Sequence, residues 1–266
     1  MRDFRWKTYE LTSPKLKKES GRVRFCFLSD LHGSSFGENY IDLIDAIKSR
    51  RPDGILVGGD MMVSSHPDFS GPQALLTELG NICPVWYALG NHEYRLMQWP
   101  WKYGEGYAAY EKSMAEAGVH FLHNTSGELT VRDSRFRIYG LELEMAFFRK
   151  PHAPYLKLAH MQKLLRMHRA AGEPYTILLA HNPKYAKTYF QWGADLTLSG
   201  HYHGGILRFN EHHGLVAPQA PIFPKYCCGD FYQKGKAIVV SAGLGEHTLP
   251  IRIHNPREVI EIVIHG

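Results

Sequence analysis

Side chains that can bind metal ions recur along this sequence, and each group of them follows a short apolar run. The runs are FCFLSD, GILVGGD, VWYALGNHE, YTILLAH and ADLTLSGHYH. The metal-ligand candidates at their ends are Asp30, His32, Asp60, Asn91, His181, His201 and His203, with His92 beside them. Carboxylate, amide and imidazole groups without a thiolate suit Mn, Fe or Zn. The sequence therefore predicts a metal site assembled from strand ends.

The candidate set is larger than one ion needs, because a tetrahedral zinc ion takes about four ligands. A single bridging carboxylate lets two ions share such a set. Two divalent ions about 3.5–4 Å apart form the usual clamp for in-line displacement at phosphorus. We therefore expect two divalent metal ions, Mn, Fe or Zn. The expected chemistry is hydrolysis of a phosphate ester by a hydroxide lying between them, which bound cations make available near neutral pH.

Each part of this pattern also has an ordinary structural explanation. Asp-x-His is common in turns, Gly-Gly-Asp is common in loops, and an isolated His181 is more often a structural histidine. Packing alone does not explain why all the parts occur together, each after an apolar run. Glycines adjoin these side chains and leave room beside them; they are Gly58, Gly59, Gly90 and Gly200.

Apolar runs and helical periodicities alternate along the chain. Strands are predicted at residues 23–28, 54–57, 85–89, 128–131, 136–141, 176–179, 195–198, 205–209, 237–241 and 259–264. Helices are predicted around residues 40–47, 74–79 and 107–117, with a long helix around residues 158–165. Residues 128–141 should form an antiparallel pair, and Asn182 should cap a helix that starts at Pro183.

This alternation of strands and helices predicts an α/β fold of stacked sheets flanked by helices. Ligand sites in such folds open at the carboxyl ends of the strands, so the candidate ligands should meet in one crevice.

Composition limits the class of protein. The chain has 266 residues, with 44% apolar and 21% charged, which suits one globular domain. No apolar run approaches the roughly 20 residues of a membrane span, and the first residues lack the apolar core of a secretory signal. We therefore expect a cytoplasmic location. The four cysteines do not form a disulfide framework, and the net charge of +5 favours anionic partners.

The ordered blocks resemble the calcineurin-like metallophosphoesterase superfamily. They are Asp30-x-His32, Gly59-Asp60, Gly90-Asn91-His92-Glu93, His181 and Gly200-His201-x-His203. The resemblance implies a four-layer α/β/β/α sandwich with a dimetal site at the strand carboxyl ends, formed by residues 1–266 as a single metallophosphoesterase domain.

The resemblance also assigns roles to the candidate residues. It implies that one metal is held by Asp30, His32, Asp60 and His203. The other is held by Asp60, Asn91, His181 and His201, with Asp60 bridging the two. His92 is then a catalytic histidine that binds no metal, stabilises charge on the phosphoryl oxygens and protonates the leaving group.

The segments SGHYHGG and SAGLGEHTLPIR resemble the bacterial branch of membrane-associated phosphodiesterases, some of which cleave lipid-linked pyrophosphates. The expected substrate is a phosphorylated small molecule or a lipid-linked compound, with peripheral membrane contact. The sequence has no specific signal for nucleic-acid binding and does not indicate an oligomeric state.

One residue and two segments have two interpretations each. Glu93 is either a carboxylate that orients a histidine or a solvated loop residue. The aromatic segment 94–110 is either a lid or lipid-facing wall, or a loop that packs its own aromatic side chains onto the domain. The proline-rich segment 218–228 either shapes the rim of the site or is a rigid surface connection.

The sequence leaves more than one function open. The leading prediction is a dinuclear metal-dependent phosphodiesterase or pyrophosphatase. A phosphomonoesterase or a nuclease of the same superfamily is the first alternative. A non-catalytic scaffold of the same fold is the second, although a scaffold should lack several ligands and this chain has all of them.

Overall fold

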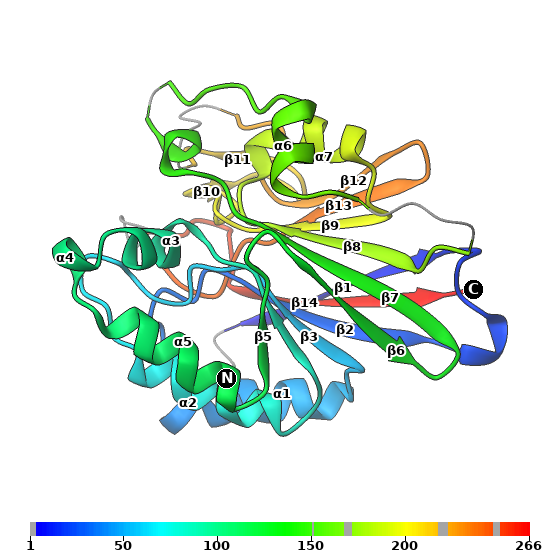
Figure 1. Ribbon diagram of the computed structural model, residues 1–266, viewed down its shortest axis with the longest axis horizontal. Helices are drawn as coiled ribbons and strands as arrows, with labels where there is room; N and C mark the ends of the chain where they lie inside the picture. The colour runs from blue at the N-terminus through cyan, green and yellow to red at the C-terminus, as the bar shows by residue number, and fades with distance from the viewer. Residues whose placement is uncertain (1–3, 151, 168–171, 218–222, 247–250) are drawn as a thin grey trace.

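Two six-stranded sheets form the centre of the protein in the computed structural model (Figure 1), which describes residues 4–150, 152–167, 172–217, 223–246 and 251–266. The first sheet has the order β1-β14-β2-β3-β4-β5, and the second has the order β12-β13-β9-β8-β7-β6. The strands of the first sheet are β1 (Arg5–Thr12), β2 (Val23–Leu28), β3 (Gly54–Val57), β4 (Val85–Tyr87), β5 (Val119–Phe121) and β14 (Glu258–His265). Those of the second are β6 (Ser126–Val131), β7 (Ser134–Leu141), β8 (Tyr175–Ala180), β9 (Leu196–Ser199), β12 (Gly229–Gln233) and β13 (Lys236–Val240).

The strands that precede the candidate ligands run parallel within their sheets. In the first sheet β2, β3, β4 and β5 are parallel neighbours. In the second sheet β7, β8, β9 and β13 are parallel neighbours. The carboxyl ends of β2, β3 and β4 therefore lie together at one edge, as do those of β8 and β9.

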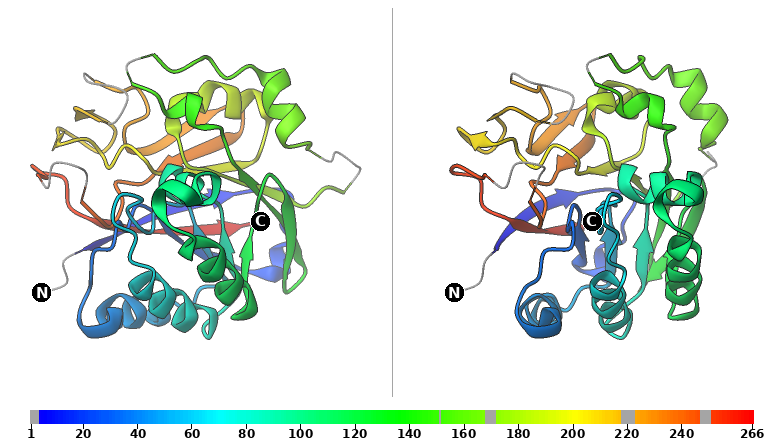
Figure 2. Two further views of the ribbon diagram at one scale, coloured as in Figure 1. Left: turned by 60° about the vertical axis from the view of Figure 1, so that its left-hand side comes forward. Right: turned by 90° about the vertical axis from the view of Figure 1, so that its left-hand side faces the viewer.

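Helices cover the outer faces of both sheets, so the layers run α/β/β/α (Figure 2). The first sheet carries α1 (Ile41–Arg50), α2 (Ser70–Gly80) and α5 (Gly106–Glu116), and the second carries α6 (Leu158–Leu164) and α7 (Ala186–Trp192). Two further helices follow β4, α3 (Asn91–Gln98) and the short α4 (Pro100–Tyr103). Short 3-10 turns lie at η1 (Lys18–Ser20), η2 (Glu38–Tyr40), η3 (Met145–Phe148) and η4 (Pro183–Tyr185), and a small two-stranded sheet joins β10 (Leu207–Arg208) to β11 (Gly214–Leu215).

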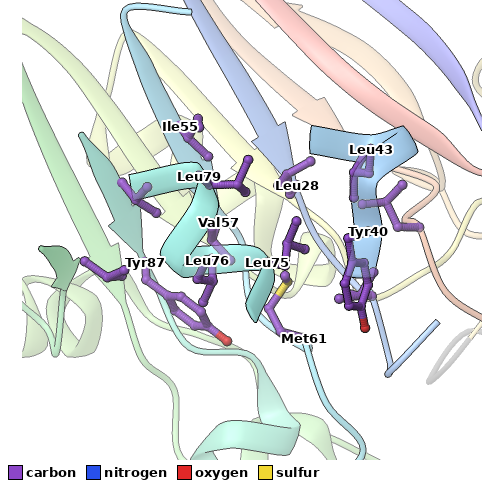
Figure 3. Packing of buried hydrophobic residues seen from close by; sticks show 14 of the residues in the cluster. Leu28, Tyr40, Leu43, Ile55, Val57, Met61, Leu75, Leu76, Leu79 and Tyr87 are labelled. Atoms are coloured by element: carbon purple, nitrogen blue, oxygen red, sulfur yellow. The ribbon is translucent and has the colours of Figure 1, made fainter. Parts of the chain in front are cut away.

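Buried apolar side chains fill the three spaces between these layers. Between the sheets, the Phe25 and Phe136 rings meet edge to face with their centroids 5.1 Å apart. Between the first sheet and its helices, Leu43 of α1 and Leu75 and Leu76 of α2 pack toward the strands (Figure 3). The apolar residues of these helices recur at the spacing of one helical face, which is why that face is buried.

The structure confirms the predicted four-layer α/β fold and most of its elements. Strands β2 and β3 have the predicted bounds, and β6 and β7 form the predicted antiparallel pair. Asn182 accepts a hydrogen bond from the backbone N–H of Lys184 at 3.1 Å, as expected of a helix cap. The four cysteines are free thiols.

One predicted helix lies where expected but is shorter than expected, and one predicted strand is largely absent. The long helix around residues 158–165 is only the short α6, because the backbone of Leu165 is extended and its carbonyl accepts a hydrogen bond from Trp192. The strand predicted at residues 205–209 is reduced to β10, because the preceding Gly204 and Gly205 have left-handed φ angles of 67° and 77°.

The main element that the sequence did not predict is β1, which pairs in parallel with β14 from the other end of the chain. Polar and apolar residues alternate only in the second half of Arg5–Thr12, and the partner strand is remote in sequence. In the described part of the chain, no helix combines the length and the apolar character needed to cross a membrane.

A histidine between two carboxylates joins three elements of the fold. His123 lies between β5 and β6; its Nε2 is 2.8 Å from Glu111 of α5, and its Nδ1 is 2.6 Å from Glu142, which follows β7. Hydrogen bonds to Glu111 and Glu142 raise the pKa of His123 from 6.5 to about 10, although partial burial opposes this.

This raised pKa predicts a pH-dependent contribution to stability. Because the folded protein holds the proton of His123 more tightly than the unfolded chain, the contribution is complete below about pH 6.5 and is lost as pH rises through about 10. His123→Gln should lower the free energy of unfolding by about 1 kcal/mol at pH 6, since the site is partly screened by solvent, and by less toward pH 10. Urea unfolding across this range, with the exposed His66→Gln as control, measures the effect; a pH-independent difference would contradict it.

Candidate metal centre

The strand ends bring the candidate ligands together where the two sheets meet. Asp30 and His32 follow β2, Asp60 follows β3, and Asn91 begins α3 directly after β4. From the second sheet, His181 follows β8, and the pair His201 and His203 follows β9. Hydrogen bonds cross between the sheets here, because the Asp30 carboxylate accepts from the His201 backbone N–H at 3.0 Å.

Two groups of candidate donor atoms lie close enough to hold an ion each. Asp30, His32 and His203 form one group and Asp60, His181 and His201 form another, with the donor atoms of each within 4.8 Å of one another. Each group is part of one ligand set that the family resemblance implies, without Asp60 in the first and without Asn91 in the second, so the full assignment stays a prediction. A third group places His92 within the same distance of His32 and Asp60, so His92 borders the centre closely.

Asp60 lies between the two groups. Its Oδ2 is 3.1 Å from His181 Nε2 and 3.8 Å from His32 Nε2. His32 is in turn 3.1 Å from His203, measured between their Nε2 atoms. Asp60 is therefore the carboxylate whose position suits a bridge between two ions.

The backbone at these positions is unusual. Five non-glycine candidates have left-handed φ angles; they are Asp30 (53°), His32 (48°), Asp60 (56°), His201 (66°) and His203 (50°). Such conformations cost energy in L-residues and persist only where the surrounding structure holds them. The tight turns after the strands aim these side chains into the centre rather than along the strand direction.

Two glycines are required by close approach to the carboxylates. A Cβ on Gly90 would lie 2.2 Å from Asp60 Oδ1, and one on Gly200 would lie 2.2 Å from Asp30 Oδ2. No side chain fits at either position without displacing a candidate ligand. Gly58, in contrast, faces the ring of Phe27, so its small size serves packing between the sheets rather than the ligands.

The chemistry of His181 indicates a site for a cation. Its Nδ1 lies 2.7 Å from the carbonyl oxygen of Gly58, so Nδ1 carries the proton and donates it. In the neutral ring the lone pair of Nε2 would face the Asp60 carboxylate, so a positive charge, either a proton on Nε2 or a metal ion, has to lie between them. Burial opposes a charged imidazole, but Asp60 and Asp30 outweigh it and raise the pKa of His181 to about 10.

The other donors fit the same interpretation. Among the described residues, none donates a hydrogen bond to the buried Oδ1 of Asn91. A buried amide oxygen without a donor is costly, and a metal ion would satisfy it.

Burial raises the pKa of Asp30. Burial acts in the same direction on Asp60, but His181, His92 and His32 hold the pKa of Asp60 well below its usual range. The donor set therefore fits divalent metal ions.

His92 is held in one tautomer by a residue that the sequence did not indicate. The backbone N–H of Ser64 donates a hydrogen bond to His92 Nδ1 at 2.8 Å, and the Ser64 hydroxyl lies 3.0 Å from the same atom. Because Nδ1 accepts, the proton of the neutral ring is on Nε2. The backbone N–H of His92 donates to Asp60 Oδ1 at 2.9 Å, which anchors α3 to the centre.

Glu93 has neither of the roles considered from the sequence. It is completely buried, so it is not a solvated loop residue, and its hydrogen bonds are to the backbone and to Tyr87 rather than to a histidine. Its Oε2 accepts from the backbone N–H groups of Asp60 (2.9 Å) and Gly90 (3.1 Å). Its Oε1 accepts from the Met61 N–H and the Tyr87 hydroxyl, both at 2.7 Å. Glu93 thus fixes the loop that carries Asp60.

The centre opens into a cavity of about 360 Å³. Its lining combines His32, Asp60, Asn91, His92, His201 and His203 with residues that the sequence did not single out, namely Val63, Ser65, Arg95, Phe148, Lys150 and Glu246. A larger cavity of about 1010 Å³ lies beside α5, β5 and β6 and is lined by none of the candidate ligands. The chemistry therefore belongs to the smaller cavity.

Comparison with known proteins agrees with this geometry. A family model for calcineurin-like phosphoesterases matches residues 23–205, which include all the candidate ligands. The chain belongs to the calcineurin-like phosphoesterase family. This membership confirms, at the level of the family, the predicted metal-dependent hydrolase of phosphate esters, and the family's use of divalent metals agrees with the donor clusters described above.

Individual relatives are distant in sequence. The chain is 28% identical to an uncharacterised metallophosphoesterase of Campylobacter jejuni, over 98% of this chain and 63% of that protein. It is also 28% identical to the phosphodiesterase YaeI of Escherichia coli, over 72% of this chain and 64% of that protein. The chain thus spans less than two thirds of the length of these relatives.

A solved structure shows the same fold. The sulfate thiohydrolase SoxB of Thermus thermophilus superposes with a TM-score of 0.51 at 15% identity, covering 84% of this chain and 52% of that one. At this level of identity, the likeness concerns the fold alone.

The aromatic segment 94–110 combines features of both predicted alternatives. It is helical rather than a loop, spanning parts of α3, α4 and α5. Tyr107 and Tyr110 are buried against the domain, whereas Trp101 on α4 is 79% exposed. Of segment 218–228, residues 218–222 lie outside the described residues, while Cys227 and Cys228 are buried.

The contacts of Glu93 predict a role in positioning. Glu93→Gln replaces one acceptor oxygen by an NH₂ group that faces backbone N–H donors, so it should lower the free energy of unfolding by about 1–3 kcal/mol and weaken metal binding through the Asp60 loop. Urea unfolding in EDTA and metal titration measure the two effects. The exposed Glu116→Gln is the matched control; unchanged stability and unchanged metal affinity in Glu93→Gln would rule out this role.

Proposed function

We propose that this chain is a phosphodiesterase that works with two divalent metal ions. The observation that carries the proposal is the position of Asp60, whose Oδ2 faces His181 of one donor group and His32 of the other. Two donor groups that share one carboxylate suit two neighbouring ions better than two independent sites.

The proposed ligands follow the two groups. Asp30, His32, Asp60 and His203 would hold one ion, and Asp60, Asn91, His181 and His201 the other. Such ions, when bound, polarise the phosphoryl oxygens and lower the pKa of water. The chain itself supplies the fixed geometry, since Glu93, Ser64 and the backbone hydrogen bonds hold these groups before substrate arrives.

The proposed role of His92 follows from its tautomer. With Nδ1 accepting from Ser64, Nε2 is the nitrogen that carries a proton at the cavity. It can donate a hydrogen bond to a phosphoryl oxygen and pass its proton to the departing oxygen, as a general acid does. The Ser64 contact also fixes the orientation of the ring.

A diester is the substrate class we favour, because the E. coli relative at 28% identity is named a phosphodiesterase. The substrate we propose is a phosphorylated small molecule or a lipid-linked compound. A phosphomonoesterase or a nuclease would use the same centre. The non-catalytic scaffold has no support, since every candidate ligand is present in the sequence and six of the seven belong to the two donor groups.

The proposal predicts distinct effects of two substitutions on hydrolysis of bis-p-nitrophenyl phosphate with added Mn. Asp60→Asn should lose metal and nearly all turnover. His92→Ala should retain metal but lower kcat by about 10²–10⁴-fold, the usual contribution of a general acid. Metal content is measured on the same samples, and the exposed His66→Ala serves as control.

Two outcomes would contradict this mechanism. Unchanged turnover in Asp60→Asn excludes a shared carboxylate between two ions. Faster hydrolysis of p-nitrophenyl phosphate than of the diester assigns the chain to the phosphomonoesterases instead.

We also propose that α4 contacts a membrane surface. Trp101 is 79% exposed, its neighbour Lys102 is exposed, and α4 lies at the periphery of the molecule (Figure 1). An exposed indole beside a cation suits the interface of an anionic bilayer.

Flotation with phosphatidylglycerol vesicles tests this contact. Trp101→Ser should weaken binding about tenfold, because the indole would no longer be buried in the interface. Tyr232→Ser, which removes an aromatic side chain that is 61% exposed on β12, is the control. Equal binding by wild type and Trp101→Ser would exclude the role of α4.

A further inference from the structure

The cavity above the metal centre is lined by two basic side chains that the ligand scheme does not use. They are Arg95, on α3 one turn after His92, and Lys150, shortly after η3. Within the described residues, no carboxylate forms an ion pair with either of them. Both are therefore available to a ligand in the cavity.

These two side chains line the same cavity. Helix α3 and the turn η3 pack against each other. Phe148, the last residue of η3, lines the cavity, and its ring lies edge to face with that of His201 at a centroid distance of 5.3 Å. Arg95 thus lies on α3, and Lys150 follows the turn that packs against α3.

The remaining carboxylate of the cavity wall is already neutralised. Glu246, which lies in the segment between β13 and β14, is bound by Arg257 at 2.6 and 3.0 Å and lies 3.5 Å from Arg252. Neither arginine lines the cavity, so the negative charge of Glu246 is neutralised by cations that lie outside the cavity wall. Beyond the metal centre, Arg95 and Lys150 therefore give the cavity wall an excess of positive charge.

We propose that Arg95 and Lys150 form a subsite for a second phosphate, carried by the leaving group of the substrate. The proposal rests on the phosphodiesterase function above, in which His92 faces the leaving group. A planar guanidinium matches two phosphate oxygens at once, and an ammonium adds a second charge-assisted contact. The preferred substrate class is therefore a diphosphate diester rather than a simple phosphate diester.

The reaction on such a substrate is a hydrolysis that needs no other reactant. The oxygen of water bonds to one phosphorus, and the bond between that phosphorus and the bridging oxygen breaks. The bridging oxygen leaves with the second phosphate, and the two hydrogens of water are shared between the two phosphomonoester products or released as protons. The subsite holds the charge of the departing phosphomonoester.

Binding of nucleotides to the Mn-loaded protein tests the subsite without turnover. The probes are thymidine 5′-diphosphate and thymidine 5′-monophosphate, measured by titration calorimetry. Arg95→Gln/Lys150→Gln should weaken binding of the diphosphate by about tenfold per side chain and of the monophosphate by less than about threefold. The control is Lys112→Gln/Arg166→Gln, which removes two exposed cations outside this cavity.

Hydrolysis gives the second measurement. The substrates are p-nitrophenyl thymidine 5′-monophosphate and thymidine diphosphoglucose, which share the thymidylyl group and differ in the leaving group. The double variant should lose kcat/KM for the diphosphate by a factor similar to the loss in binding, and should retain it for the nitrophenyl ester.

The outcomes separate this subsite from the proposed function. Equal losses for both nucleotides, or no loss for either, overturn the subsite even if the wild type hydrolyses diesters. A selective loss of diphosphate binding supports the subsite even if the wild type hydrolyses neither ester, a result that would overturn the phosphodiesterase function alone.

Discussion

The structure depends on two carboxylates that are held away from water. Asp30 is completely buried, and Asp60 is 2% exposed. Burial of an ionised carboxylate is costly unless hydrogen bonds and opposite charges offset it. Backbone N–H groups from His201 and His92 donate to these two side chains, and histidines surround them. Divalent cations would complete the compensation, which explains why so many polar groups converge where apolar strands end.

This constraint reaches into the loops and the neighbouring layers. Left-handed turns at the ligands are tolerated where hydrogen bonds hold them. The backbone N–H of Asp60 donates to Glu93, and the Asp60 carboxylate accepts from the backbone N–H of His92. The two sheets must also stay in register, since His181 of the second sheet donates to Gly58 of the first. Packing of Phe25 against Phe136 between the sheets therefore contributes to the geometry of the centre as well as to stability.

Different elements supply the groups that would break the bond and the groups that would select the substrate. The centre and His92 are formed by strand ends and the first turn of α3. Arg95 comes from the body of α3, Phe148 from η3 and Lys150 from the residues just after η3, and these elements follow strands of different sheets. These elements can vary without moving the ligands, so substrate preference can change within one metal-binding frame.

The sequence by itself determined the layer architecture and predicted the candidate ligands, because both depend on local patterns. Apolar runs that end in Asp, Asn or His identify the strands and the polar side chains at their ends, and parallel strands place their carboxyl ends together. Tertiary structure decided the features that depend on contacts between distant residues. The pairing of β1 with β14, the Ser64 contact that selects the tautomer of His92, and the burial of Glu93 behind the Asp60 loop have no local signal. Arg95 and Lys150 line one cavity only in the folded chain, since taken singly in the sequence they resemble ordinary surface cations.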